Sequence, residues 1–124
     1  MAAQKVLVVD DSPLVRQQVR MALTDAGFDV TEAVDGQDGV NKIRSTPGFA
    51  AVVCDINMPI MNGIQLIETV RKEGHKMPIA VLSTEGNTEL MMRGKKAGCQ
   101  AWMIKPFKAD ILVAAVKKMA SMSR

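Results

Sequence analysis

The feature that most constrains the fold of this chain is a repeated alternation between short apolar runs and longer segments with helical periodicity. The apolar runs predict strands at residues 6–9, 28–33, 49–55, 79–83 and 101–104. The segments between them carry apolar residues three and four positions apart, which predicts helices at about residues 13–26, 37–45, 64–73, 87–97 and 111–119. Strands that alternate with helices form a parallel sheet with helices on both faces, so we expect a doubly wound α/β domain.

Composition indicates one globular domain and argues against several functions. The chain has 124 residues, of which 48% are hydrophobic, enough for one aliphatic core. Aromatic residues make up only 3%, so a base-stacking platform for nucleic acid is not expected. The net charge is +3, and basic pairs lie near predicted helix ends, where they complement the helix dipole rather than form a nucleic-acid patch, at 71–72, 95–96 and 117–118.

The cysteines and the hydropathy pattern favour a reduced, cytoplasmic protein. Cys54 and Cys99 lie far apart, with no histidine at metal-binding spacing, and Cys54 belongs to an apolar run in which it acts as a small hydrophobe. No apolar stretch approaches the roughly 18 residues of a membrane-spanning helix. The first strand begins too early to leave room for a signal peptide. We therefore expect no membrane insertion.

Polar residues follow directly after the predicted strands. Ligands of an open parallel sheet bind beyond the carboxyl ends of its strands, and the residues there are Asp10, Asp11, Asp55, Ser83 and Lys105. Each acid alone could be a solvated loop residue, but their joint position favours a shared site. Clustered carboxylates repel one another unless a cation lies among them, and Mg²⁺ prefers such oxygen ligands. A metal, an ammonium group and a hydroxyl around one aspartate suit phosphoryl transfer to that aspartate.

Four motifs carry a resemblance that covers essentially the whole chain. They are K-V-L-V-V-D-D-S, C-D-I-N-M-P-I-M-N-G, V-L-S-T-E and I-K-P-F, in that order. The chain resembles the receiver domains of bacterial two-component response regulators, and most of all the single-domain chemotaxis type. The resemblance implies a doubly wound five-stranded parallel sheet of order 2-1-3-4-5 with five helices, a flavodoxin-like or CheY-like fold. It also implies one receiver domain over residues 1–124, without an output domain.

The resemblance assigns roles to the residues of the predicted site. Asp55 matches the aspartate that accepts a phosphoryl group from a histidine kinase. Asp11 and Asp55 match carboxylate ligands of Mg²⁺, Asn57 matches a ligand that uses its backbone carbonyl, and Asp10 matches the acid that holds the waters of the metal. Lys105 matches the lysine that contacts the phosphoryl group, and its bond to the following proline is usually cis in relatives.

A second set of residues matches positions that couple phosphorylation to output. Ser83 matches the hydroxyl residue that swings toward the phosphoryl group, Thr84 belongs to the same switch, and Trp102 matches the switch aromatic. Trp102 is larger than the Tyr or Phe that is common there, so we expect its inward burial to be incomplete. Asn57 and Glu85 match positions that influence how water reaches the phosphoaspartate. The predicted partner face comprises one aromatic and three thioether side chains, Met91, Met92, Trp102 and Met103.

We therefore predict a stand-alone response regulator that is phosphorylated on Asp55 and then changes its binding of a partner protein, in chemotaxis or motility control. It is expected to be a phosphoacceptor rather than an enzyme with a diffusible substrate. The expected partners are a histidine kinase, a downstream target protein and a phosphatase, with no direct nucleic-acid contact. The chain itself is expected to be a monomer or a weak dimer. A phosphate sink or phosphorelay intermediate is the alternative.

Three other classes fit the sequence less well. A phosphatase of the haloacid dehalogenase type would carry a D-x-D pair on one strand, and a cap domain does not fit in this length. A flavin or nucleotide carrier would carry a glycine-rich or hydroxyl-rich loop after the first strand, where this chain has two acids. A transcription factor would add a helix-turn-helix, which the sequence does not show.

Overall fold

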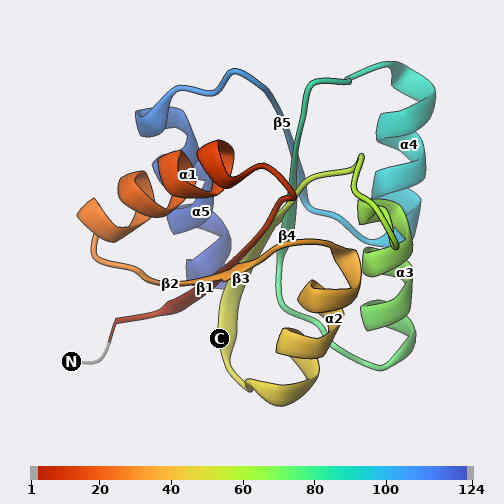
Figure 1. The fold of residues 1–124 in the computed structure, drawn as a ribbon, viewed down its shortest axis with the longest axis horizontal. Helices are drawn as coiled ribbons and strands as arrows, with labels where there is room; N and C mark the ends of the chain where they lie inside the picture. The colour runs from red at the N-terminus through yellow and green to blue at the C-terminus, as the bar shows by residue number, and fades with distance from the viewer. Residues whose placement is uncertain (1–2, 123–124) are drawn as a thin grey trace.

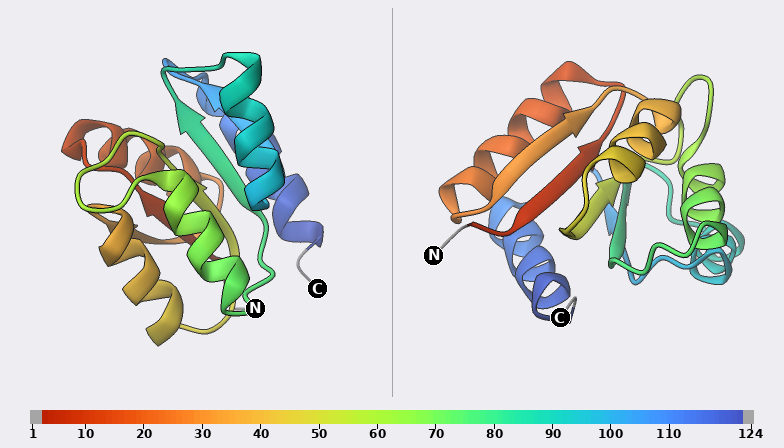
Figure 2. Two further views of the ribbon diagram at one scale, coloured as in Figure 1. Left: turned by 90° about the vertical axis from the view of Figure 1, so that its right-hand side faces the viewer. Right: turned by 90° about the horizontal axis from the view of Figure 1, so that it is seen from below.

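The computed structural model describes residues 3–122 and shows a parallel five-stranded sheet in the order β2-β1-β3-β4-β5. The strands are β1 (Lys5–Val9), β2 (Asp29–Ala33), β3 (Phe49–Cys54), β4 (Ile79–Ser83) and β5 (Ala101–Ile104). The helices are α1 (Pro13–Asp25), α2 (Gly36–Ser45), α3 (Gly63–Lys72), α4 (Thr88–Ala97) and α5 (Ala109–Met122). Helices α1 and α5 lie on one side of the sheet and α2, α3 and α4 on the other (Figures 1 and 2). The expected α/β fold and strand order are confirmed.

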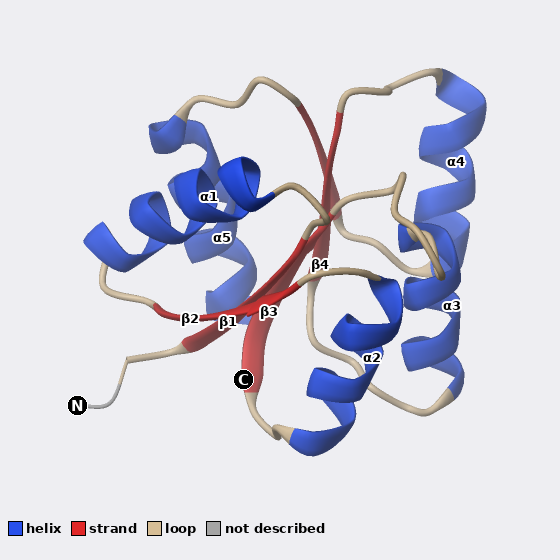
Figure 3. Cartoon of the chain, viewed as in Figure 1, coloured by secondary structure: helices blue, strands red, loops and turns tan. Residues whose placement is uncertain are grey.

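The central strands β1, β3 and β4 are almost wholly buried, because helices cover both faces of the sheet (Figure 3). Every residue of β3 is buried, which accounts for the continuous apolar run in the sequence. Leu7 and Val81 belong to the core beneath α2, α3 and α4, whereas Val8 and Leu82 belong to the core beneath α1 and α5. Successive residues of a strand thus enter two separate cores.

Polar side chains begin the helices that follow the carboxyl ends of the strands. Ser12 accepts a hydrogen bond from the N–H of Val15 at the start of α1, directly before Pro13 at the first helical position. Asn62 and Gln65 form a reciprocal capping box at the start of α3. These caps hold the loops that carry the predicted site close to the sheet.

Element boundaries differ from the prediction by a few residues. β3 ends at Cys54, so Asp55 is the first residue beyond the sheet. Helix α5 runs from Ala109 to Met122, longer than predicted, because its first two and last two residues are exposed and do not continue the apolar stripe. Within residues 3–122, no helix combines the length and apolarity needed to cross a bilayer.

Candidate functional site

The predicted acids meet at the carboxyl edge of the sheet. Asp10 follows β1 and Asp55 follows β3, and these strands are neighbours, with Val9 opposite Cys54. One carboxylate oxygen from each of Asp10, Asp11 and Asp55 lies within 4.8 Å of the others. Asp10 and Asp55 are only 2% and 7% exposed, whereas Asp11 is exposed. The structure therefore confirms that these three acids converge.

Lys105 brings a positive charge to the acids from the edge of the sheet. It follows β5, and its backbone N–H donates to the carbonyl of Ser83 at 2.8 Å, which extends the pairing of β4 with β5. Its Nζ lies 2.9 Å from Oδ2 of Asp10 and 3.3 Å from Oδ2 of Asp55. The peptide bond from Lys105 to Pro106 is cis. One ammonium group is thus shared between the two buried carboxylates.

Backbone N–H groups hold the second oxygen of each buried carboxylate. Oδ1 of Asp10 accepts a hydrogen bond from the N–H of Ser12 at 2.9 Å. Oδ1 of Asp55 accepts one from the N–H of Ile56 at 2.8 Å. The Oδ2 atoms of both acids face Lys105. The two carboxylates are therefore oriented before any ligand arrives.

The crowding of these charges shifts two pKa values. Burial, together with the negative charge of Asp10, raises the pKa of Asp55 above its ordinary value, although Lys105 and the N–H of Ile56 oppose this shift. Burial disfavours the charged form of Lys105, but its hydrogen bond to Asp10 and the charges of both acids raise its pKa. Lys105 is therefore charged at neutral pH, where it pairs with Asp10 and Asp55.

The donor set of the cluster fits a hard divalent cation. Three carboxylates outnumber the single ammonium group, and the candidate ligand atoms are all oxygens, as Mg²⁺ prefers. Within residues 3–122, the side chain of Asp11 makes no hydrogen bond or ion pair, so both of its oxygens are available to a metal. The residues present therefore suit the Mg²⁺ site that the sequence predicts.

The loop after β4 joins several predicted residues through hydrogen bonds. Ser83 is buried, and its Oγ accepts from the N–H of Glu85 at 3.1 Å. The carbonyl of Glu85 accepts from the indole Nε1 of Trp102 at 2.8 Å, and its carboxylate accepts from Nδ2 of Asn57 at 3.1 Å. Thr84 is exposed and lines a groove beside α1. Glu85 thus connects the hydroxyl of Ser83 to the indole of Trp102.

Trp102 packs beneath α4 in a slot that Gly94 leaves open. A Cβ at position 94 would lie 2.7 Å from Cζ3 of the indole. The ring packs against the core beneath α2, α3 and α4 and is partly buried. The sequence presents Gly94 only as a weak point within a helix, whereas the structure shows that it makes room for the ring.

The predicted partner face is divided between the two sides of the sheet. A groove of about 590 Å³ between α4 and β5 is lined by Met91, Met92 and Trp102, among others. Met103 instead packs against the core beneath α1 and α5. Trp102 and Met103 therefore point to opposite sides of the edge strand β5, because neighbouring residues of a strand point in opposite directions. The partner face itself stays a prediction. Ile104, which is 49% exposed, follows Met103 and returns to the side of Trp102.

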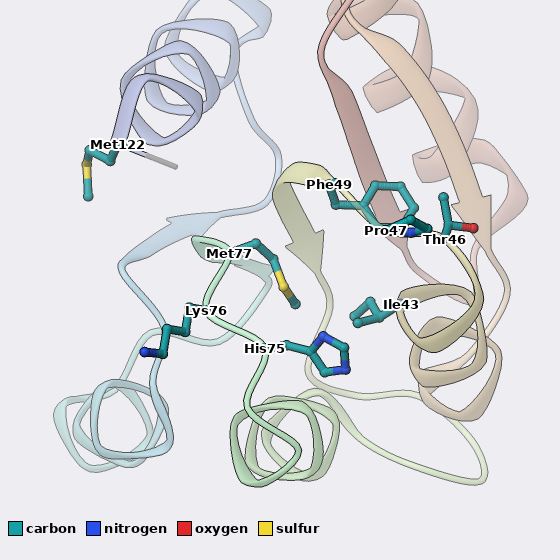
Figure 4. A pocket seen from close by; sticks show the side chains of 9 residues that line it. Ile43, Thr46, Pro47, Phe49, His75, Lys76, Met77 and Met122 are labelled. Carbon is teal, nitrogen blue, oxygen red and sulfur yellow. The ribbon is translucent and has the colours of Figure 1, made fainter. Parts of the chain in front are cut away.

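A further hollow lies at the opposite edge of the sheet (Figure 4). It has a volume of about 470 Å³, and Phe49, His75 and Met77 are among the residues that line it. These residues lie at or before the amino ends of β3 and β4. Nε2 of His75 is 3.9 Å from a carboxylate oxygen of Glu73. None of the predicted site residues lines this hollow.

Two arginines that the sequence did not mark as site residues donate hydrogen bonds to main-chain carbonyls at the ends of β1, α3 and α4. Nη1 of Arg16, on α1, donates to the carbonyl of Asp10 at 2.7 Å. Arg71, at the end of α3, donates to the carbonyls of His75 and Gly98, at 2.9 and 2.8 Å from the nearest nitrogen. The sequence marks Arg71 only as a cation near a helix end, and nothing in the motif pattern reveals either carbonyl contact.

The chain thus has a doubly wound parallel sheet with an acid cluster and a lysine at its carboxyl edge, an arrangement that suits phosphoryl transfer to an aspartate. The family model for the response regulator receiver domain matches residues 6–117. The chain therefore belongs to the response regulator receiver family of two-component signalling, and it is of the CheY-like type. Receiver domains are phosphoacceptors that generally bind Mg²⁺ at an acidic pocket, and Asp10, Asp11 and Asp55 form such a pocket here.

Three comparisons place the chain within this family. Chemotaxis protein CheY of Treponema pallidum is 37% identical over 107 residues, which cover 85% of this chain and 74% of the relative. Transcriptional regulatory protein PrrA of Mycobacterium leprae is 33% identical over 118 residues, 95% of this chain, which spans only 50% of that longer relative. The structure of CheY4 of Vibrio cholerae matches with a TM-score of 0.89 and 37% identity, covering 95% of this chain and 99% of the other.

Proposed function

We propose that this chain accepts a phosphoryl group from a histidine kinase on Asp55, in a reaction that depends on Mg²⁺. The observation that carries the proposal is the position of Asp55 in the acid cluster, where its Oδ2 lies 3.3 Å from the ammonium of Lys105. A nucleophilic carboxylate beside a fixed cation is the arrangement that phosphoryl transfer requires.

The residues of this chain supply the nucleophile and a fixed positive charge. A carboxylate oxygen of Asp55 forms a bond to phosphorus while the bond from phosphorus to the donor nitrogen breaks. Lys105 is held by Asp10 at 2.9 Å, so its ammonium is already in place to pair with a phosphoryl oxygen. The N–H of Ile56 fixes the other oxygen of Asp55. When bound, Mg²⁺ supplies further charge neutralisation for the incoming phosphoryl oxygens.

The proposed metal ligands come from two loops. Asp11 and Asp55 would contribute carboxylates, Asn57 would contribute its backbone carbonyl, and Asp10 would hold water of the metal. This assignment is supported by the 4.8 Å limit on the separation of the three acid oxygens and by the unpaired state of the Asp11 side chain within residues 3–122. The side chain of Asn57 donates to Glu85 at 3.1 Å, which supports a joint role of the two residues in the access of water to Asp55.

Phosphorylation is proposed to reach the α4 face through Ser83, Thr84, Glu85 and Trp102. Ser83 Oγ now accepts from the N–H of Glu85. If the hydroxyl turns to a phosphoryl oxygen, this bond is lost and the loop that carries Thr84 and Glu85 rearranges. Because the indole of Trp102 donates to the carbonyl of Glu85, the rearrangement alters the support of the ring beneath α4. A phosphoryl group shifts this equilibrium by its differential interaction with the two states.

The proposed output is the binding of another protein at the groove between α4 and β5, which Met91, Met92 and Trp102 line. Thioether side chains suit adaptable recognition. Similarity to chemotaxis proteins of Treponema pallidum and Vibrio cholerae supports a role in chemotaxis or motility control. Action as a stand-alone regulator, and the alternative of a phosphate sink, stay predictions from the sequence.

Phosphoryl uptake from acetyl phosphate, with and without Mg²⁺, tests the proposal. Intact-mass measurement is expected to show one added phosphoryl group on the wild type and on the control Asp29→Asn, an exposed acid at the start of β2. Asp55→Asn is expected to show none. Uptake by Asp55→Asn at the wild-type rate would remove Asp55 from the role. Beryllofluoride, a phosphoryl mimic, is expected to change Trp102 fluorescence in the wild type and in Asp29→Asn, but not in Asp55→Asn.

A further inference from the structure

Arg16 contacts the acid pair through a group that the proposed phosphorylation chemistry does not use. Its Nη1 donates to the main-chain carbonyl of Asp10 at 2.7 Å, and its Nε lies 3.3 Å from Oε1 of Glu32 on β2. The Arg16 side chain is only 14% exposed. A largely buried guanidinium therefore ties the end of β1 to both α1 and β2, while its charge is paired with Glu32 outside the metal cluster.

The carbonyl that Arg16 holds belongs to the peptide that joins Asp10 to Asp11. Because a peptide unit is planar, fixing this oxygen fixes the plane that contains the Cα of Asp11. The carboxylate of Asp10 is separately held by the N–H of Ser12 and by Lys105. The side chain of Asp11 has no such contacts among residues 3–122. The direction in which Asp11 points therefore depends on its backbone.

We propose that Arg16 is a positioning residue, which orients Asp11 for Mg²⁺ by holding the peptide between Asp10 and Asp11. The proposal rests on the proposed function, because it takes Asp11 as a metal ligand. Among residues 3–122, the hydrogen-bond partners of the Arg16 side chain are the Asp10 carbonyl and Glu32. Arg16 therefore acts through the backbone and leaves the carboxylate oxygens of the cluster free.

The sign of the effect on Mg²⁺ binding separates positioning from simple charge. Arg16 is a cation near a cation site, so removing its charge alone would tighten Mg²⁺ binding. Loss of a held carbonyl would instead weaken binding, because Asp11 would lose its orientation. Arg20, one turn further along α1, is the matched control: its Nε lies 3.1 Å from Oε2 of the same Glu32, and it makes no contact with Asp10.

Mg²⁺ titration by calorimetry is the test, followed by uptake from acetyl phosphate across a range of Mg²⁺ concentrations. Arg16→Met is expected to raise the Kd for Mg²⁺ by at least about tenfold, the effect of losing one hydrogen bond from a charged donor. Phosphoryl uptake at saturating Mg²⁺ is expected to change less than about twofold, since the nucleophile and lysine are untouched. Arg16→Lys keeps the charge and a single donor group, the ammonium. Its Kd for Mg²⁺ is expected to lie between that of the wild type and that of Arg16→Met.

The Arg20 variants are the controls for the Arg16 variants. Arg20→Met is expected to leave the Kd unchanged or lower it, and Arg20→Lys to leave it unchanged. If Arg16→Met does not fold, the comparison of Arg16→Lys with Arg20→Lys tests the proposal. A higher Kd for Mg²⁺ in Arg16→Lys but not in Arg20→Lys supports it. The proposal is overturned if both Arg16 variants bind Mg²⁺ with the wild-type Kd. It is also overturned if the Arg20 variants lose as much Mg²⁺ affinity as the Arg16 variants do. A wild type that neither binds Mg²⁺ nor takes up a phosphoryl group overturns the proposed function instead.

Discussion

The replacement Lys105→Met tests whether a single ammonium group holds the acid cluster together. Nζ of Lys105 lies 2.9 Å and 3.3 Å from oxygens of Asp10 and Asp55. At an effective dielectric constant of about 20, each of these contacts is worth roughly 5 kcal/mol of attraction. Burial of the ammonium costs several kcal/mol in return. We expect the variant to lose about 3–5 kcal/mol of unfolding free energy, because two buried carboxylates lose the opposite charge that they share.

The loss is expected to depend on pH in a defined direction. Lys105 lowers the pKa of Asp55, whose net shift is upward because of burial and the charge of Asp10. Removing the lysine raises that pKa further, so the folded variant binds a proton more tightly than its unfolded chain does. The unfolding free energy of the variant therefore increases as pH falls through the raised pKa of Asp55. The difference in unfolding free energy between the variant and the wild type becomes smaller.

Urea denaturation without Mg²⁺, at neutral and at mildly acidic pH, measures both effects. The control is Lys108→Met, since Lys108 is exposed and makes no ion pair within residues 3–122. We expect it to unfold like the wild type at both pH values. Equal stability of Lys105→Met and the wild type at neutral pH, or a gap that widens in acid, would refute the electrostatic account of this cluster.

Three further predictions concern single features of the structure. Gly94→Ala would place a Cβ 2.7 Å from the Trp102 ring. Although alanine has the better helix propensity, we expect the variant to lose about 1–2 kcal/mol of unfolding free energy, measured by urea denaturation, and to show a red shift of tryptophan emission. The Asp55 carboxyl, followed by NMR without metal, is expected to titrate above its ordinary pKa of about 3.9, and Mg²⁺ is expected to lower that pKa. A metal-free pKa at or below about 3.9 would contradict the claim that burial and the charge of Asp10 raise it. Arg71→Met is expected to cost about 1.5–3 kcal/mol of unfolding free energy through its lost carbonyl contacts, whereas exposed Lys72→Met is expected to cost almost nothing.

The alternation of apolar runs and amphipathic segments was enough to predict the class of fold and the place of the site. Parallel strands all have their carboxyl ends at one edge of the sheet, so residues that follow β1, β3 and β5 had to come near one another. The convergence of Asp10, Asp55 and Lys105 follows from this topology. The order of the strands came from the resemblance to a family, because periodicity alone does not distinguish one parallel order from another.

Only the tertiary structure decided which side chains share a contact. The hydroxyl of Ser83 reaches Trp102 through the peptide groups of Glu85, and Gly94 opens the slot for the ring. Met103 lies on the far side of the sheet from Trp102. Such contacts depend on the register of strands and on helices that pack from distant parts of the chain, and a local sequence pattern carries neither. Residue spacing therefore determined where the charges gather, and packing determined how each one is held.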